Sequence, residues 1–274
     1  DRELGRRRGG ALPIVYTPLH GSGAVPVREL LSRVGLSNVI SVPEQSAPDG
    51  HFPTVTAPNP EDPNAFRLAI ALAEQKGARV CLATDPDADR LGVAVKTKAD
   101  EWVTLTGNQI GCILLEHILS SMSRQKRLPK NGVVIKSIVS TRLADAISAA
   151  YGVAVDEYQT SGEKTFLFGF EESFGFLAGG LARDKDAVCA AMLAAEACIA
   201  YAERGMTLSD ALDEIYATYG FYSESVKSYT LEGKEGMEKI AGAMQSLRNH
   251  PPKSFANTAI VTAEDYLARR CVNT

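Results

Sequence analysis

The sequence predicts an α/β fold made of two consecutive three-layer α/β/α domains with mixed sheets. Short apolar runs typical of strands alternate with amphipathic runs typical of helices. This alternation runs through residues 11–106 and is repeated in residues 107–222, which argues for two similar layered units. The length of 274 residues gives room for about two domains at the usual ~150 residues each.

Residues 11–106 form the first predicted domain. Its expected elements are a strand at 12–16, a helix at 26–34, a strand at 39–42, a helix at 64–76, and strands at 78–83 and 91–96. Gly35 and Gly77 follow the two helices, and glycine is common just after a helix ends. Residues 43–60 are rich in proline and show no periodicity, which indicates an ordered loop or a lid.

Residues 107–222 form the second predicted domain, and the rest of the chain is expected to be linker. The expected elements are helices at 109–122, 141–151, 186–203 and 208–219, and strands at 132–138 and 166–170. Residues 1–10 read as a linker tail. Residues 223–274 read as a linker toward a further domain, with a lone helix at 234–248 and one short strand at 259–261.

The composition excludes several classes of protein. The formal net charge of −4, without a dominant basic face, argues against nucleic-acid binding. The longest apolar stretch, residues 187–202, is interrupted by Glu196 and is too short for a membrane span, so it predicts a buried helix and no membrane segment. Five cysteines without a Cys-x-x-Cys pair, and no signal peptide in this sequence, favour a reducing, cytoplasmic location.

Three aspartates alternate in a short run between two apolar strands: Asp85, Asp87 and Asp89. An extended loop would direct all three carboxylates to one side, and such converging oxygens select Mg²⁺ or Ca²⁺. An EF-hand calcium loop is excluded, because Arg90 and Lys96 stand where that loop needs Gly and Glu. The aspartyl-nucleophile phosphatases do not share this pattern. The remaining structural alternative is a solvated acidic turn.

A second candidate site follows the strand expected at 166–170. Glu171, Glu172 and Ser173 stand between Gly169 and Gly175. Carboxylates accept hydrogen bonds from sugar hydroxyls, so this turn suits a polyol ligand. Exposed glutamates in an ordinary turn are the alternative interpretation.

Lys185 lies at the expected start of the long second-domain helix, between Asp184 and Asp186. Either aspartate makes a good helix N-cap, which gives a purely structural interpretation. The helix dipole lowers the pKa of Lys185 and the two carboxylates raise it, so the effects oppose each other. A lysine at this place suits phosphate binding or proton transfer. Among the four histidines, we expect only His20, in a strand-to-helix turn, near a ligand edge.

Together these segments resemble the α-D-phosphohexomutase family, which comprises the phosphoglucomutases and phosphomannomutases. The resemblance covers residues 12–266. Its parts are the magnesium loop (84–90), the sugar-recognition loop (169–175), the segment with a candidate proton-transfer lysine (183–186), and the starts of the second and third domains (17–23 and 107–109). The Glu-Glu-Ser form of the sugar loop favours the glucose branch of the family.

The resemblance implies roles for seven residues. They are Asp85, Asp87 and Asp89 as Mg²⁺ ligands, Glu171 and Ser173 as ligands of hexose hydroxyls, Lys185 in proton transfer, and Arg90 on the transferred phosphate. The implied reaction interconverts hexose 1-phosphate and hexose 6-phosphate through a phosphoserine and a hexose 1,6-bisphosphate, such as glucose 1,6-bisphosphate. Such chemistry depends on positioning and electrostatics.

Two parts of the family pattern have no counterpart in this sequence. They are the phosphoserine motif of the first domain and the phosphate-binding Arg and Ser-Gly-Thr loop of the fourth. The stretch 159–165 is also shorter than the loop and helix that the family has there. We therefore expect the two middle domains of a phosphohexomutase, with the first and fourth domains missing, and no turnover by this chain alone.

Two other interpretations remain open from the sequence. The chain is alternatively a stand-alone, non-catalytic module that binds a metal and a sugar phosphate. It is also compatible with an unrelated α/β enzyme, such as a nucleotide-binding one, in which the acidic loop is only a turn.

Overall fold

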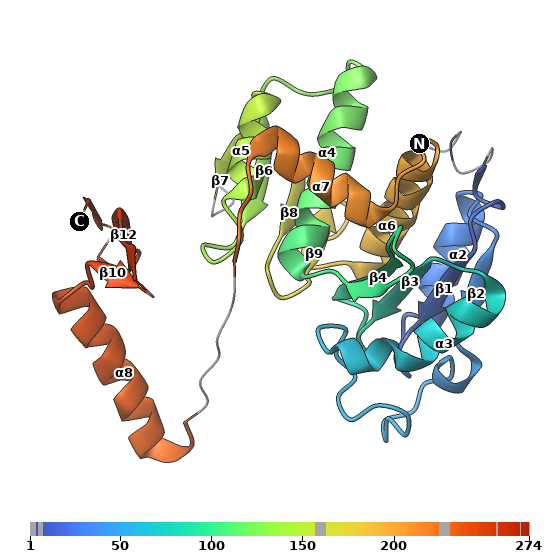
Figure 1. The fold of residues 1–274 in the computed structure, drawn as a ribbon, viewed down its shortest axis with the longest axis horizontal. Helices are drawn as coiled ribbons and strands as arrows, with labels where there is room; N and C mark the ends of the chain where they lie inside the picture. Colours follow the sequence, from blue (N-terminus) through green and yellow to red (C-terminus); the bar gives the residue numbers. More distant parts are fainter. Residues whose placement is uncertain are drawn as a thin grey trace. The chain divides into compact units, whose positions relative to one another are not determined.

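The computed structural model describes residues 4, 8–156, 163–224, 231–255, 257–268 and 270–273. The chain divides into two compact units, residues 1–223 and 224–274. The first unit contains two β-sheets with helices packed against them (Figure 1). The unusually short stretch 159–165 lies largely outside the described residues, which resume at Glu163.

The first sheet has five strands in the order β2-β1-β3-β4-β5. β1 is parallel to β2 and β3, whereas β4 is antiparallel to β3 and β5, so the sheet is mixed as predicted. The sequence analysis missed β5. The strands are β1 (Ile14–Thr17), β2 (Val39–Ser41), β3 (Val80–Thr84), β4 (Leu91–Lys96) and β5 (Trp102–Thr104).

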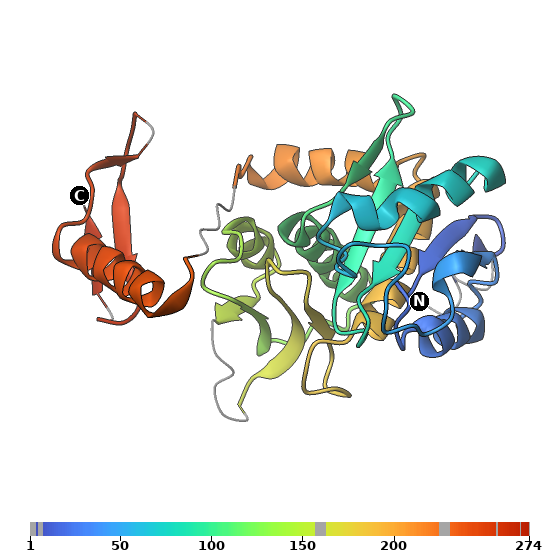
Figure 2. The ribbon, with the colours of Figure 1, turned by 90° about the horizontal axis from the view of Figure 1, so that it is seen from below.

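The two faces of the first sheet enter separate apolar cores. Leu82 of β3 faces a core that also contains side chains of α2 and α6, whereas its neighbour Cys81 faces a smaller core with side chains of α3. Figure 2 shows α2 and α3 on opposite sides of this sheet. Because both faces are covered, the β3 sequence is apolar at every position but its last instead of alternating. These helices are α2 (Ala24–Arg33), α3 (Arg67–Lys76) and α6 (Ala187–Ala202).

Helix α6 links the two domains. It follows the second sheet in the chain, but it packs against α2 and against β3 and β4 of the first sheet. A single buried cluster therefore runs from Leu31 in α2 through Ala191 in α6 to Phe168 in the second sheet. This shared core fixes the two domains against each other, so loops from both can contribute to one site.

The second sheet has four strands in the order β7-β6-β8-β9. β6 is parallel to β7 and β8, and β9 is antiparallel to β8, so this sheet is mixed too. The three-residue strands β7 and β9 were not predicted either. Its elements are α4 (Gly107–Arg124), β6 (Gly132–Lys136), α5 (Leu143–Ala150), β7 (Ala154–Asp156), β8 (Thr165–Phe170), β9 (Phe176–Ala178) and α7 (Leu208–Tyr219).

Local capping residues explain where several helices begin. Thr106 and Gln109 form a reciprocal capping box, so α4 starts two residues earlier than predicted. The helix expected at 64–76 is divided: Asp62 caps a short 3-10 turn, η2 (Pro63–Phe66), and α3 follows it. A second 3-10 turn, η1 (Pro43–Gln45), lies within the proline-rich loop.

Residues 224–274 are more structured than the predicted linker with one helix and one strand. They contain α8 (Gly233–Asn249) and two antiparallel hairpins. The strand expected at 259–261 is not continuous there, because Ile260 and Val261 fall between two strands of different hairpins. The hairpin strands are β10 (Ser254–Phe255) with β11 (Thr258–Ala259), and β12 (Thr262–Asp265) with β13 (Arg270–Asn273).

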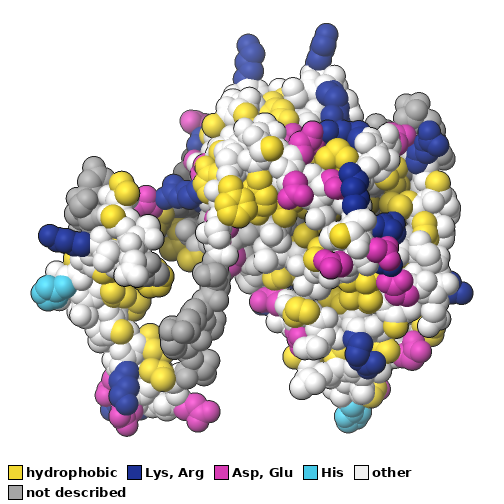
Figure 3. All heavy atoms as spheres, viewed as in Figure 1, with side chains coloured by type: hydrophobic (Ala, Val, Ile, Leu, Met, Phe, Trp, Pro, Cys, Tyr) yellow, Lys and Arg dark blue, Asp and Glu magenta, His cyan; other side chains and the backbone are white. Residues whose placement is uncertain are grey.

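On the face of the molecule seen in Figure 3, acidic and basic side chains are interspersed. Within the described part of the chain, every helix falls short of the length or apolar character that crossing a membrane would require.

Candidate active site

The acidic loop is a tight turn between β3 and β4, and not the extended loop that the alternation suggested. The carboxylate of Asp85 accepts hydrogen bonds from the backbone N–H groups of Asp89 (3.1 Å) and Arg90 (3.0 Å). Ala88 adopts a left-handed conformation with a φ of 60° and donates its N–H to the carbonyl of Asp85 at 3.1 Å. The side chain of Asp85 therefore closes the turn, and the turn brings the alternating carboxylates together.

The three predicted metal ligands converge. One carboxylate oxygen from each of Asp85, Asp87 and Asp89 lies within 4.8 Å of the others. Burial, helped by the neighbouring Asp89 carboxylate, raises the pKa of Asp85 to about 7. Burial also acts to raise the pKa of Asp89, but hydrogen bonds from Lys185 and Asp85 lower it overall. A buried carboxylate that resists ionisation beside two others fits a site for a hard divalent cation such as Mg²⁺.

The turn that follows β1 packs against the acidic loop and supports it. The backbone N–H and hydroxyl of Ser22 both donate to the carbonyl of Pro86, at 2.8 and 3.0 Å. Gly21 is required for this approach, because a Cβ there would lie 2.3 Å from the Cα of Pro86. His20, which the sequence placed near a ligand edge, is instead 4% exposed and bonds to the Thr54 hydroxyl at 2.9 Å.

The sugar-loop segment is the turn between β8 and β9, and it is bonded directly to the acidic loop. The N–H of Glu171 donates to the carbonyl of Gly175 at 3.0 Å, which closes the turn. The N–H of Leu91, the first residue of β4, donates to the carbonyl of Phe174 at 3.0 Å, and Arg90 forms an antiparallel bridge with Gly175. Two loops that are far apart in the sequence therefore form one continuous surface.

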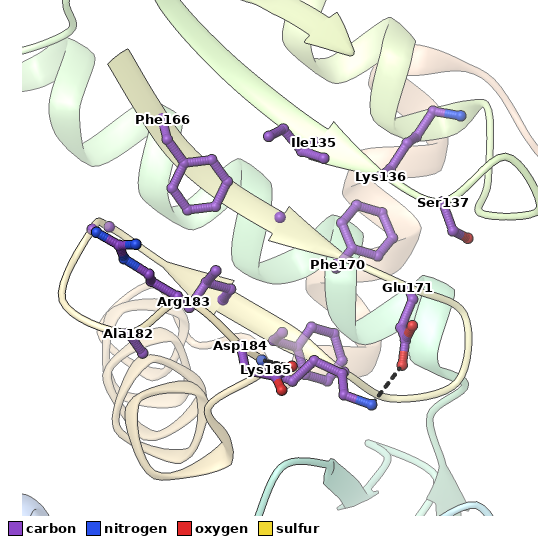
Figure 4. A pocket seen from close by; sticks show the side chains of 16 residues that line it. Ile135, Lys136, Ser137, Phe166, Phe170, Glu171, Ala182, Arg183, Asp184 and Lys185 are labelled. Carbon is purple, nitrogen blue, oxygen red and sulfur yellow. Dashed lines mark hydrogen bonds and ion pairs between the residues drawn. The ribbon is translucent and has the colours of Figure 1, made fainter. Parts of the chain in front are cut away.

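Lys185 joins these two loops through its side chain. Its Nζ lies 2.9 Å from Oδ2 of Asp89 and 3.4 Å from Oε1 of Glu171. The hydrogen bond to Asp89, together with the charge of Glu171, raises the pKa of Lys185, so its ammonium is charged at neutral pH. Asp186 caps α6 by accepting from the N–H of Cys189 at 3.0 Å, so Lys185 precedes the helix and extends toward the loops. Figure 4 shows Lys185 and Glu171 directed at each other.

A pocket of about 800 Å³ lies beside the junction of the two loops, where Lys185 contacts Asp89 and Glu171. Glu171 and Lys185 line it at one end, together with the ends of β6 and β8. Lys136 and Ser137 at the end of β6 also line it, and the sequence analysis missed both (Figure 4). The structure ends β6 at Lys136, whereas the predicted strand ran to residue 138, so the sequence did not place these residues at a strand end.

The remaining predicted residues occupy different places around the junction. The carboxylate of Glu172 accepts from the Ser137 hydroxyl at 2.8 Å, so it supports the turn from the side of β6. Ser173 is partly buried in the same turn, but it is not among the described residues that line the pocket. Arg90 follows the acidic loop and donates to the carboxylate of Glu61 at 2.9 Å. Glu61 was another residue without a predicted role.

Comparisons with known proteins agree with this arrangement. Residues 2–98 match the profile of the phosphoglucomutase/phosphomannomutase α/β/α domain II, and residues 106–219 match that of domain III. A phosphoglucomutase of Staphylococcus aureus (strain bovine RF122) is 35% identical over 268 residues, covering 93% of this chain and 48% of the relative. The chain thus spans about half the length of the curated relatives it matches.

Solved structures show the same fold. A putative phosphomannomutase from Thermus thermophilus aligns with a TM-score of 0.61 and 22% identity, over 80% of this chain and 48% of that one. An N-acetylphosphoglucosamine mutase from Aspergillus fumigatus, in complex with glucose 1,6-bisphosphate, aligns with a TM-score of 0.50 and 15% identity, over 89% and 56%. On the two domain profiles, which together cover most of its length, the chain belongs to the phosphoglucomutase/phosphomannomutase family and holds α/β/α domains II and III.

Proposed function

We propose that this chain supplies the metal site and the hexose-recognition site of a phosphohexomutase. The observation that carries the proposal is the position of Lys185, which contacts Asp89 of the acidic loop and Glu171 of the sugar loop at once. A phosphoryl group bound at the first loop would therefore lie next to a hexose bound at the second. The preferred hexose in this proposal is glucose, in line with the Glu-Glu-Ser sequence of the sugar loop.

Asp85, Asp87 and Asp89 would hold Mg²⁺ through their converging oxygens. When bound, the cation would neutralise charge on the transferred phosphoryl group. The turn contributes rigidity, because Asp85 is fixed by two backbone N–H groups before any ligand arrives. Asp87 is the most exposed of the three and is the side chain with most freedom to adjust.

Arg90 and Lys185 would act on the phosphoryl group and on the proton. The guanidinium of Arg90 stands beside the acidic loop, where it would hold equatorial phosphoryl oxygens. Lys185 is held charged by its two carboxylate partners, so it is prepared to donate a proton to the oxygen that leaves phosphorus and not to accept one.

The proposed chemistry is a pair of balanced phosphoryl transfers. A hydroxyl of the hexose monophosphate attacks a phosphoserine; its O–P bond forms, the phosphoserine P–O bond breaks, the hydroxyl loses its proton and the serine oxygen gains one. The bisphosphate then returns its other phosphate to the serine: the serine O–P bond forms, that phosphate's bond to the sugar oxygen breaks, the serine hydroxyl loses its proton and the sugar oxygen gains one. Glu171 and Ser173 would hold the hexose hydroxyls in both steps. The phosphoserine is not supplied by the described site, so we propose that this chain binds substrate without turnover.

A binding measurement tests this proposal. Calorimetric titration of glucose 1,6-bisphosphate in the presence of Mg²⁺ is expected to show binding by the wild-type chain, at least tenfold weaker binding by Glu171→Gln, and unchanged binding by the control Glu101→Gln. A coupled assay for glucose 6-phosphate formation is expected to give no rate above background. Absence of binding, or binding of a dinucleotide in its place, would contradict the proposal. Measurable turnover would contradict the claim that the chain only binds.

The stand-alone module remains the second candidate. It predicts the same binding, but it differs in its response to a phosphoserine-bearing domain taken from a relative. Addition of that domain would leave a non-catalytic module inactive, and would restore a rate in a mutase fragment.

A further inference from the structure

The guanidinium of Arg90 lies among three carboxylates, but it bonds to only one of them. Its Nη1 donates to Oε1 of Glu61 at 2.9 Å. Its Nε is 4.0 Å from Oδ2 of Asp85 and 3.8 Å from Oδ1 of Asp89, which is beyond the range of an N–H···O hydrogen bond. Arg90 is therefore hydrogen-bonded to Glu61, and it lies within ion-pair distance but outside hydrogen-bond distance of the two proposed metal ligands.

The position of Glu61 is fixed by several independent contacts. The side chain of Asn59 accepts from the N–H of Glu61 at 3.0 Å, and the carbonyl of Asn59 accepts from the N–H of Asp62 at 3.0 Å. Pro60 is buried against β4, and the fit needs a glycine there: a Cβ on Gly92 would lie 2.7 Å from the Cβ of Pro60. These contacts hold the backbone of the turn, from which the partly exposed side chain of Glu61 reaches Arg90.

We infer that Glu61 is a positioning residue that keeps the guanidinium of Arg90 off the carboxylates of Asp85 and Asp89, and so leaves both available to Mg²⁺. The inference rests on the proposed function, in which these carboxylates are metal ligands. Arginine pairs strongly with carboxylates and often through two hydrogen bonds. Without Glu61, a shift of about 1 Å would let the guanidinium bond to a ligand carboxylate and compete with the cation.

The hydrogen bond with Glu61 also orients Arg90 for its proposed role, which is to bind phosphoryl oxygens. Glu61 accepts a hydrogen bond from one edge of the guanidinium. This contact limits the rotation of the Arg90 side chain and so sets the direction of its remaining N–H donors. Residues that hydrogen-bond to metal ligands, or to the neighbours of those ligands, typically lower metal affinity by about 10- to 100-fold when they are removed.

A double-mutant cycle separates this role from a simple charge effect. Removal of any nearby negative charge weakens cation binding to some degree through Coulomb's law, whether or not Arg90 is present. We therefore measure Mg²⁺ affinity by calorimetry for Glu61→Gln in the wild-type background and in an Arg90→Gln background. We expect about tenfold weaker binding in the first case and only the smaller Coulombic loss in the second. Glu101→Gln, in the hairpin at the opposite end of β4, is the matched control.

A crystal structure of metal-free Glu61→Gln provides a second measurement. We expect the guanidinium of Arg90 within hydrogen-bond distance of the Asp85 or Asp89 carboxylate. An unmoved guanidinium, equal losses of Mg²⁺ affinity in both backgrounds, or no loss at all would overturn the inference. If the wild-type chain binds no Mg²⁺, the proposed metal site is wrong, and the crystal structure alone then decides whether Glu61 restrains Arg90.

Discussion

The ammonium of Lys185 lies 2.9 Å from a carboxylate oxygen of Asp89. The two residues come from different domains, and the contact depends on the packing of α6 against the first sheet. Because Lys185 also contacts Glu171, one side chain connects the proposed metal loop with the proposed sugar loop. Changes at this junction should therefore affect metal binding and sugar binding together.

Replacement of Lys185 by methionine should tighten Mg²⁺ binding and weaken sugar bisphosphate binding. The ammonium competes with the cation for Asp89, and two charges near a protein surface interact by a few kcal/mol at most. We expect up to about tenfold higher Mg²⁺ affinity and at least tenfold lower affinity for glucose 1,6-bisphosphate, both measured by calorimetry. Lys130→Met, at an exposed position, is the control. A loss of both affinities would indicate that Lys185 only supports the fold.

Three glycine-to-alanine variants should differ in whether they lose bisphosphate binding, stability or neither. In Gly175→Ala the new Cβ would lie 2.2 Å from Cδ of Lys185, a flexible side chain that moves away. This variant should keep its melting temperature within a few degrees and lose bisphosphate binding. In Gly21→Ala the Cβ meets the Pro86 backbone at 2.3 Å, so the protein should lose roughly 2 kcal/mol or more of stability. Gly50→Ala meets no atom within 4 Å and serves as the control. Thermal unfolding and calorimetry measure stability and bisphosphate binding for all three variants. A large loss of stability in Gly175→Ala, or none in Gly21→Ala, would contradict the prediction.

The contribution of Asp85 to the stability of the metal-free chain should fall as the pH rises from about 4 to about 7. Burial and the Asp89 carboxylate raise the pKa of Asp85 from its ordinary value of 3.8 to about 7, so the folded state keeps a proton that the unfolded chain releases. The unfolded state is therefore favoured as the pH increases through this window, by about 2 to 4 kcal/mol in total. Asp85→Asn keeps an oxygen acceptor but does not ionise, so its stability should change less. Urea unfolding in EDTA measures both proteins, and parallel pH profiles would disprove the expected role of Asp85.

One of the five thiols should react much faster than the others in the folded protein. Cys271 is exposed, whereas burial raises the pKa of Cys81 and of Cys198 to about 12 and that of Cys189 to about 11. Cys112 is fully buried in the core. Because the thiolate is the reactive form, titration with Ellman's reagent at pH 8 should show one fast equivalent, which Cys271→Ser removes. A second fast equivalent would show that the core opens readily.

Much of the fold was predictable from the sequence, because most strands and helices are long enough to show their periodicity. The two strands that flank the acidic loop were predicted correctly, and the three carboxylates of the loop converge. The sequence analysis attributed this convergence to an extended loop, which was wrong. It depends instead on a turn closed by Asp85 and on the left-handed conformation of Ala88. The strands β5, β7 and β9 were missed, although β2, which is equally short, was predicted; each missed strand is held in place by pairing with a longer neighbour.

The relations between loops were not accessible from local sequence. Neither the contact of Lys185 with Asp89 nor that of Glu61 with Arg90 follows from spacing, because each joins segments that only tertiary packing brings together. The raised pKa of Lys185 has the same origin: the sequence showed opposing influences, and the structure adds Asp89 and Glu171, which decide the direction.

The most direct test of this account is the linkage between Mg²⁺ and sugar bisphosphate. Calorimetric titration of glucose 1,6-bisphosphate is made with and without saturating Mg²⁺, for the wild-type chain and for Asp87→Ala. If the acidic loop and the sugar loop form one site, Mg²⁺ strengthens bisphosphate binding of the wild-type chain at least tenfold, and Asp87→Ala loses this enhancement. Equal bisphosphate affinity with and without Mg²⁺ in the wild-type chain, or an undiminished enhancement in Asp87→Ala, would contradict it.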